Sequence, residues 1–154
     1  MTSRKSRLAL VAGLLALLAG AGCATMTEAD VKQQLSEAAK PYARRGPQQL
    51  IPIYAESRMV AIGLIAEARS DPSSSLSRGV GRQLDRARRR NAHVVVGGPY
   101  PDLSDRILTN ALKLNAKGQL RGLNVVFVSD EEPTSNLIEA ARLSQTRIHH
   151  QAPR

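Results

Sequence analysis

The chain is poor in cysteine and in aromatic residues. Among its 154 residues are 1 Cys, 1 Phe and 3 Tyr, and there is no Trp. A single cysteine excludes an internal disulfide, so the fold must depend on its apolar core. So few aromatic side chains argue against a surface on which bases or sugar rings stack. We therefore expect no nucleic acid among the partners of this protein.

The motifs of familiar catalytic and cofactor sites are missing as well. The sequence has no H-E-x-x-H zinc motif, no nucleophilic serine elbow, no G-x-G-x-x-G segment and no P-loop. Nothing pairs its lone cysteine with a histidine as a nucleophile would require. We therefore expect a protein that is not an enzyme and that carries no cofactor or metal.

The N-terminal residues have the pattern of an export signal. Arg4, Lys5 and Arg7 precede an uncharged apolar run over 8–18, and small residues then lead to Cys23. The apolar run is shorter than the roughly 20 residues that a membrane-spanning helix requires. The pattern therefore predicts export of the chain rather than a membrane span.

The end of this signal, Leu-Ala-Gly-Ala-Gly-Cys over 18–23, resembles the lipobox of bacterial lipoproteins. The resemblance implies removal of residues 1–22 and attachment of a lipid such as palmitate to the thiol of Cys23. Gly20 departs from the family pattern, which usually has Leu, Val or Ile at that position. Cleavage by an ordinary signal peptidase one or two residues before the cysteine is therefore the alternative.

The residue after the cysteine bears on the location of the protein. It is Ala24, whereas Asp at this position favours retention in the inner membrane in the lipoproteins that this segment resembles. The resemblance therefore implies an anchor in the outer membrane of a Gram-negative-type bacterium, with the domain on the periplasmic face. Two or three acyl chains anchor a protein firmly, so a lipid-modified Cys23 would be a stable tether.

Without residues 1–22 the chain is moderately basic. The 132 residues left have lost three basic side chains and no acidic one, so the net charge falls from +9 to +6. This length is sufficient for one domain with a sizeable core. The charge favours contact with an acidic face of an envelope protein or with anionic lipid head groups.

A tether and an amphipathic helix are expected over 23–46, ahead of an α/β domain over 47–154. Thr27 and Asp30 have the spacing of a capping box at the start of a helix. Apolar residues then recur at helical spacing from Val31 onward. The pattern leaves open whether this helix packs on the domain or serves as a spacer.

The segment over 48–70 is open to two interpretations. The apolar run over 59–66 is typical of a buried strand, whereas its neighbours are helix-favouring residues. We favour a helix over about 53–69, with Pro52 at its start. This helix would be apolar nearly all round and therefore heavily buried.

From residue 76 onward, helices and strands alternate. Amphipathic periodicity and capping residues mark the helices, and short β-branched runs mark the strands. Asp105 is expected at the third position of its helix, and Leu137, Ile138 and Ala141 are expected to face the core. We expect helices from Leu76, from Asp102 to Lys117-Gly118 and after Asp130–Pro133, and strands over 94–96, 125–128 and 146–150.

This succession of elements predicts the fold class. Continuous apolar strands are typical of parallel sheets that are covered on both faces, and the intervening helices supply the cover. We therefore expect a Rossmann-like α/β fold with the order α-β-α-β-α-β. It would have a small, three- to four-stranded, mainly parallel sheet with helices on both faces, preceded by one or two N-terminal helices.

The first candidate site lies where the expected strands end. In open parallel sheets, ligands bind beyond the carboxyl ends of the strands. Glycines there permit close approach of a ligand, and an Asp–His pair could serve base catalysis. The alternatives are a tight turn, acids that favour a helix N-terminus, and a frayed chain end. This candidate rim comprises Gly97, Gly98, Tyr100, Asp130 and His150.

The second candidate site is a stripe of arginines on the helix that begins near residue 76. Arginine makes bidentate contacts with carboxylates and phosphates. Only Asp85 offers an acid on the same helix, so the stripe is poorly neutralised. It predicts a docking face for an acidic partner or for lipid phosphates, with a solvated helix face as the alternative. The arginine stripe comprises Arg78, Arg82, Arg86, Arg89 and Arg90.

Three functions compete on these observations. We favour a non-enzymatic adaptor or scaffold in an envelope assembly, held by its lipid and docked through the arginine stripe. The alternative is a periplasmic small-ligand-binding domain, or a hydrolase-like enzyme, that uses Gly97, Gly98 and Asp130. A purely structural tether between the outer membrane and a periplasmic complex is the third.

Overall fold

The structure of the protein, a computed structural model, describes residues 26–153. The export signal and Cys23 lie outside this range. Within it are five α-helices, one 3-10 helix and one four-stranded sheet, and none of the helices is long and apolar enough to cross a membrane. The elements are α2 (Glu28–Ala39), η1 (Lys40–Arg45), β1 (Gln48–Pro52), α3 (Arg58–Ser70), α4 (Ser75–Arg89), β2 (His93–Gly97), α5 (Pro101–Leu114), β3 (Asn124–Val128), α6 (Ser135–Ser144) and β4 (Arg147–Gln151).

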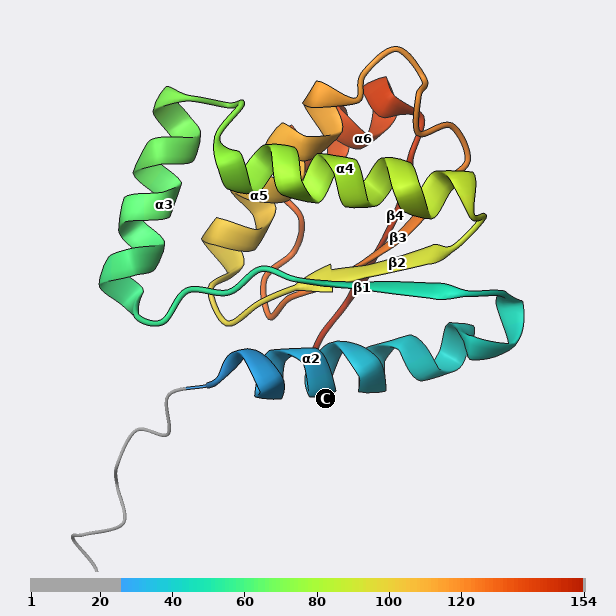
Figure 1. The fold of residues 1–154 in the computed structure, drawn as a ribbon, viewed down its shortest axis with the longest axis horizontal. Coiled ribbons are helices and arrows are strands. Elements are labelled where there is room, and N and C mark those ends of the chain that lie inside the picture. The colour runs from blue at the N-terminus through green and yellow to red at the C-terminus, as the bar shows by residue number, and fades with distance from the viewer. Residues whose placement is uncertain (1–25, 154) are drawn as a thin grey trace, which may run out of the picture.

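The strands are all parallel, and they lie side by side in chain order, β1-β2-β3-β4. Every crossover therefore moves the chain in the same direction, and crossovers between parallel strands are right-handed. The helices that connect the strands, α3 to α6, consequently lie on one side of the sheet, and α2 lies on the other (Figure 1). The predicted α/β fold with helices on both faces is confirmed.

The main core fills the space between the sheet and the layer of α3 to α6. Its largest side chains include Phe127 on β3, Leu84 on α4, Ile107 on α5 and Leu137 on α6, and each of them is at most 1% exposed. Removing one such side chain from water contributes about 1.5–3 kcal/mol. This core fixes α4 against α5 and so holds the elements on which the candidate site lies.

A smaller core lies on the other side of the sheet, under α2. Val31 and Leu35 are completely buried there, and they pack against Val95 and Val126. The predicted apolar spacing of this helix is thus confirmed. Because its apolar face covers the sheet, α2 is packed on the domain and does not act as a free spacer.

The start of α2 has the predicted capping box. The Thr27 hydroxyl accepts a hydrogen bond from the Asp30 backbone N–H at 3.2 Å, and the Thr27 backbone N–H donates to the Asp30 carboxylate at 2.7 Å. The Thr27 hydroxyl also donates to this carboxylate at 2.7 Å. Hydrogen bonds from the Thr27 side chain and then from its backbone stabilise the charged carboxylate and lower the pKa of Asp30.

The segment over 48–70 differs from the prediction at its start. Gln48–Pro52 forms β1, an edge strand that was not predicted, and Pro52 ends this strand instead of beginning a helix. Proline is tolerated at a sheet edge because the unpaired side of the strand needs no N–H donor. The helix begins later, at Arg58, where the Ser57 hydroxyl accepts from the Val60 N–H at 3.3 Å.

The expectation that this helix is heavily buried is wrong. Only Ala61 and Ala68 of α3 are buried, whereas Met59 is 76% exposed and Ile62 is 50% exposed. The reason is the position of α3, which packs mainly on α5 at the margin of the helical layer (Figure 1). A helix with one neighbour buries one narrow face, whatever its composition.

The later elements follow the prediction, with small changes at their ends. The predicted strands are present as β2, β3 and β4, but α5 ends at Leu114 instead of near Lys117. In α6, Leu137 and Ala141 face the core as expected, whereas Ile138 is 58% exposed. Ala140 is buried instead, because it lies one helical turn after Leu137 on the inward face.

Candidate functional site

The arginine stripe lies on α4, and this helix is held firmly by its other face. Val80, Leu84 and Ala87 are buried against the core, and the Ser74 hydroxyl caps the helix start by accepting from the Ser77 N–H. The predicted amphipathic pattern is confirmed. Burial of the apolar face leaves the positions between these residues, which carry the arginines, on the surface.

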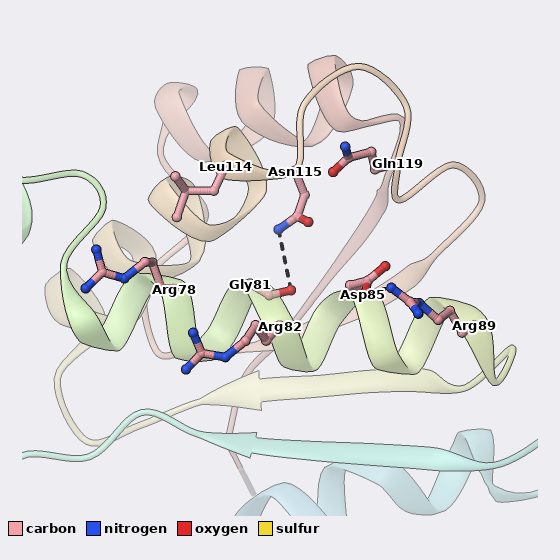
Figure 2. A pocket seen from close by; sticks show the side chains of 8 residues that line it. All are labelled: Arg78, Gly81, Arg82, Asp85, Arg89, Leu114, Asn115 and Gln119. Carbon is pink, nitrogen blue, oxygen red and sulfur yellow. Dashed lines mark hydrogen bonds and ion pairs between the residues drawn. The ribbon is translucent and has the colours of Figure 1, made fainter.

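A close contact between α4 and the end of α5 shapes the surface beside the arginines. The Asn115 side-chain amide donates to the backbone carbonyls of Ala111 at 2.9 Å and of Gly81 at 3.4 Å (Figure 2). Gly81 permits this approach, since a Cβ there would lie only 3.0 Å from the Asn115 side-chain nitrogen. The two helices are therefore tied together along one line, with a depression above it.

This depression is a groove of about 580 Å³, which lies within the range of ligand-sized cavities. One wall is the outer side of α4, and the other comes from the last residue of α5 and the loop behind it (Figure 2). We call it the arginine groove. It is lined by Arg78, Gly81, Arg82, Asp85, Arg89, Leu114, Asn115 and Gln119.

The charges in the arginine groove are unbalanced. Arg89 pairs with Asp85 at 2.6 Å, one helical turn away. Neither Arg78 nor Arg82 forms an ion pair with any residue of the described range 26–153. Leu114, which is 41% exposed, adds an apolar surface to the wall opposite α4. The arginine groove therefore offers two free guanidinium groups beside an apolar contact.

The structure divides the predicted arginine stripe. Arg78, Arg82 and Arg89 line the arginine groove, whereas Arg86 and Arg90 are exposed and lie outside it. The helical spacing alone could not separate these two sets, because the opposite wall of the groove belongs to a different element.

Sequence reasoning missed the opposite wall of the arginine groove. Leu114, Asn115 and Gln119 lie at the end of α5 and in the loop that follows. The one available signal was Gly81, a glycine among the buried positions of α4. Such a glycine indicates close approach of another backbone or side chain, but it does not identify the neighbour.

The glycines of the candidate rim are explained by packing. A Cβ at Gly97 would collide with the Val128 carbonyl, and one at Gly98 would collide with the Ile53 carbonyl. The Ile53 N–H also donates to the Gly97 carbonyl at 2.8 Å. The protein backbone thus occupies the space that these glycines leave open.

The other rim residues do not converge on one site. Tyr100 is half-buried against the main core, and the Arg58 guanidinium lies 6.0 Å from the centre of its ring. A ring nitrogen of His150, Nε2, lies 2.9 Å from the Ser129 carbonyl oxygen, while Asp130 is exposed. None of the five main cavities found within residues 26–153 is lined by a rim residue.

Asp105, an acid near the rim, serves local structure. Asp105 was expected at the third position of its helix, but α5 begins at Pro101, so Asp105 is its fifth residue. Its carboxylate accepts from the Thr134 N–H at 2.9 Å and from the Thr134 hydroxyl at 2.8 Å. Thr134 in turn caps α6. In the part of the chain that the structure describes, no group of three or more His, Cys, Asp or Glu could hold a metal ion.

His93 lies at the opposite end of the sheet from the rim, as its place at the start of β2 predicts. Its position therefore keeps it away from Asp130 and His150.

Comparisons of the chain with models of protein families, with curated proteins and with solved structures found no match.

Proposed function

We propose that this protein is a lipid-anchored adaptor on the periplasmic face of the outer membrane, and that its arginine groove binds an acidic segment of an envelope partner. The observation that carries the proposal is the pair of unpaired guanidiniums, Arg78 and Arg82, beside the exposed Leu114. Charges without partners, next to an apolar surface in a groove, are what a complementary chain would neutralise and cover.

The chemistry of the arginine groove indicates the kind of segment that fits. Arg78 and Arg82 are four residues apart on α4, so their guanidiniums lie one helical turn from each other. Each can form two parallel hydrogen bonds with a carboxylate. A segment with two acidic side chains and an apolar side chain against Leu114 would satisfy all three groups. Asp85 would repel a third acid beside Arg89.

The position of the proposed anchor leaves the arginine groove accessible. Cys23 precedes α2 by only five positions, a length that spans at most about 18 Å when extended. The start of α2 lies at the end of the molecule where the strands finish, and α2 and α4 lie on opposite sides of the sheet (Figure 1). A membrane at the α2 start would therefore leave the α4 side open to the periplasm.

The test is in-cell crosslinking followed by a pull-down of the tagged protein. The double variant Arg78→Glu/Arg82→Glu reverses both free charges of the groove. Its matched control, Arg86→Glu/Arg90→Glu, makes the same charge change at the last turn and the C-cap of α4, outside the groove. We expect the first variant to lose its partner by about tenfold or more, since each charged hydrogen bond contributes about 1.5–3 kcal/mol, and the control to retain it.

Two other results would contradict the proposal. Equal retention or equal loss of the partner in both variants would show that the arginine groove does not select it. Unchanged recovery in Cys23→Ala, with the protein still at the membrane, would show that the anchor is not at this cysteine. Circular dichroism of each variant checks that α4 has stayed folded.

A further inference from the structure

The amino ends of the four strands are surrounded by basic residues. The chain enters these strands from the ends of η1, α4, α5 and α6, and twelve Lys or Arg residues lie in these four entry segments without a single Asp or Glu. Only three of the twelve form ion pairs with acids on the adjoining helices, within the described range. The entry segments are 40–48, 86–93, 113–124 and 142–147.

A cavity of about 300 Å³ opens in the middle of this basic region. It lies between the start of β2 and the start of β3, and all of its lining residues come from the segments that lead into these two strands. No acidic side chain is among them. We call it the amino-end cavity, and it is lined by Arg88, Asn91, Ala92, His93, Arg121, Gly122, Leu123 and Asn124.

The two guanidiniums of the amino-end cavity are held in place through one nitrogen each. Arg88 Nε donates to the Arg121 backbone carbonyl at 2.7 Å, and Arg121 Nε donates to the Gln145 side-chain oxygen at 2.5 Å. The terminal nitrogens of Arg88 and Arg121 make no hydrogen bond or ion pair with any residue over 26–153. Four NH₂ groups are therefore oriented and unused.

The remaining polar groups of the amino-end cavity can also meet an anion. His93 is also among its lining residues, but its ring packs beside that of Tyr42, with 6.0 Å between the ring centres. Asn91 and Asn124 add side-chain amides that can donate. Two fixed positive charges with further donors, and no competing carboxylate, match a dianion with several acceptor oxygens.

A helix dipole cannot be the source of attraction at this site. α4 ends at Arg89, so its carbonyl end, which carries partial negative charge, lies beside the cavity. Basic residues at such an end do stabilise a helix. That role, however, does not require one guanidinium from α4 and another from the loop before β3 to be oriented at one cavity by hydrogen bonds from Nε.

We propose that the amino-end cavity binds a phosphate group, through the terminal nitrogens of Arg88 and Arg121. Arginine is the side chain best suited to paired hydrogen bonds with phosphate oxygens. This site uses none of the arginines of the stripe, and it does not rest on the lipid anchor or on the proposed adaptor function. Its location, at the amino ends of parallel strands, is opposite to the usual ligand position in such sheets.

The test is an NMR titration of the purified protein with inorganic phosphate, at constant ionic strength, that follows the arginine Nε–H signals. The Nε–H groups of Arg88 and Arg121 are hydrogen-bonded, so their signals exchange slowly enough to be observed. We expect both signals to shift along one saturable curve. Arg88→Gln and Arg121→Gln should each weaken the apparent Kd at least tenfold, because each removes charged hydrogen bonds. Acetate is expected to bind far more weakly than phosphate.

Arg44→Gln is the matched control, because it removes one positive charge from an exposed position of the same basic region without lining the cavity. We expect it to bind phosphate as the unchanged protein does. An equal loss of affinity in all three variants would overturn the site in favour of general charge attraction. The absence of any saturable shift, or equal binding of acetate and phosphate, would overturn the assignment to phosphate. Backbone amide spectra confirm that each variant is folded.

Discussion

The two ends of the parallel sheet differ in charge and in what fills them. At the carboxyl end lie Asp102, in the first turn of α5, and the acids of the turn that leads into α6. The space beside the glycines there is filled by the backbone carbonyls of Ile53 and Val128. At the amino end, basic residues surround an open cavity that contains no acid. The glycine rim at the carboxyl end is therefore closed by the protein backbone, whereas the amino end holds an open cavity.

Helix dipoles explain the sign of this charge separation. The helices that lead back into β2, β3 and β4, which are α4, α5 and α6, begin near the carboxyl end of the sheet and finish near the amino end (Figure 1). Acids stabilise helix starts and bases stabilise helix ends, so this topology gathers each sign at one end. The dipoles do not explain why the glycine rim is closed while the basic end has a cavity, and this difference directs our phosphate-site proposal to the amino end.

The largest expected effect tests whether the carboxyl end is truly filled. Gly98→Val should destabilise the protein by about 3 kcal/mol or more, since the new side chain meets the Ile53 backbone carbonyl. Urea unfolding measures the change. Gly79→Ala, a glycine on α4 with open space around it, is the control and should gain about 0.5–1 kcal/mol. A Gly98→Val protein as stable as the original would mean that the rim has room for a ligand.

A smaller effect is expected from the acids at the carboxyl end. Asp105→Asn should cost about 1–2 kcal/mol, because the carboxylate accepts two hydrogen bonds from Thr134. Asp130→Asn should change the free energy of unfolding by less than about 0.5 kcal/mol, since Asp130 is exposed. Equal effects of the two changes in thermal unfolding would contradict the structural role that we assign to Asp105.

Removal of a basic side chain at the amino end should affect stability less still. Arg121→Gln is expected to change the free energy of unfolding by no more than about 0.5 kcal/mol, because the guanidinium is exposed and its lost hydrogen bond is replaced by water. The same urea series measures this value. A loss above about 2 kcal/mol would show that Arg121 at the basic end, like Asp105 at the acidic end, has mainly a structural role.

The smallest effect concerns the acid at the start of α2. Hydrogen bonds from Thr27 lower the pKa of Asp30, so its charged form stabilises the folded state. This stabilisation is complete above the pKa of the unfolded chain and is lost as the pH falls through the lower pKa of the folded protein. Asp30→Asn should remove that part of the acid sensitivity below about pH 4. Identical pH dependence of unfolding in the Asp30→Asn variant and the unchanged protein would contradict this role of Asp30.

Local patterns predicted most of the fold, and they failed where a neighbour decides the outcome. The alternation of β-branched runs with amphipathic helices indicated β2, β3 and β4 and the helices between them. Gln48–Pro52 has no such run and ends in proline, so β1 was not recognised as an edge strand. The apolar composition of α3 predicted burial, but only packing on α5 determines how much of a helix is covered.

The candidate site could be predicted only in part, for the same reason. The spacing of basic residues in the sequence of α4 is sufficient to predict a charged face. Which of these arginines line the groove depends on the end of α5 and the loop behind it. There Asn115 contacts Gly81, and Leu114 lines the same groove as Arg78. The amino-end cavity is even harder to predict from the sequence. Arg88 and Arg121 are far apart in the chain and meet only because the parallel strands are arranged in chain order.

The most direct test of the central claim compares the arginine groove with the rim in cells. A photo-crosslinking amino acid is placed at Gln119, in the groove, and in a second strain at the exposed Asp130, at the rim. We predict that the Gln119 position forms a specific crosslink with an envelope protein and that the Asp130 position does not. A specific crosslink from Asp130 with none from Gln119 would contradict the account, because the carboxyl end would then be the functional surface.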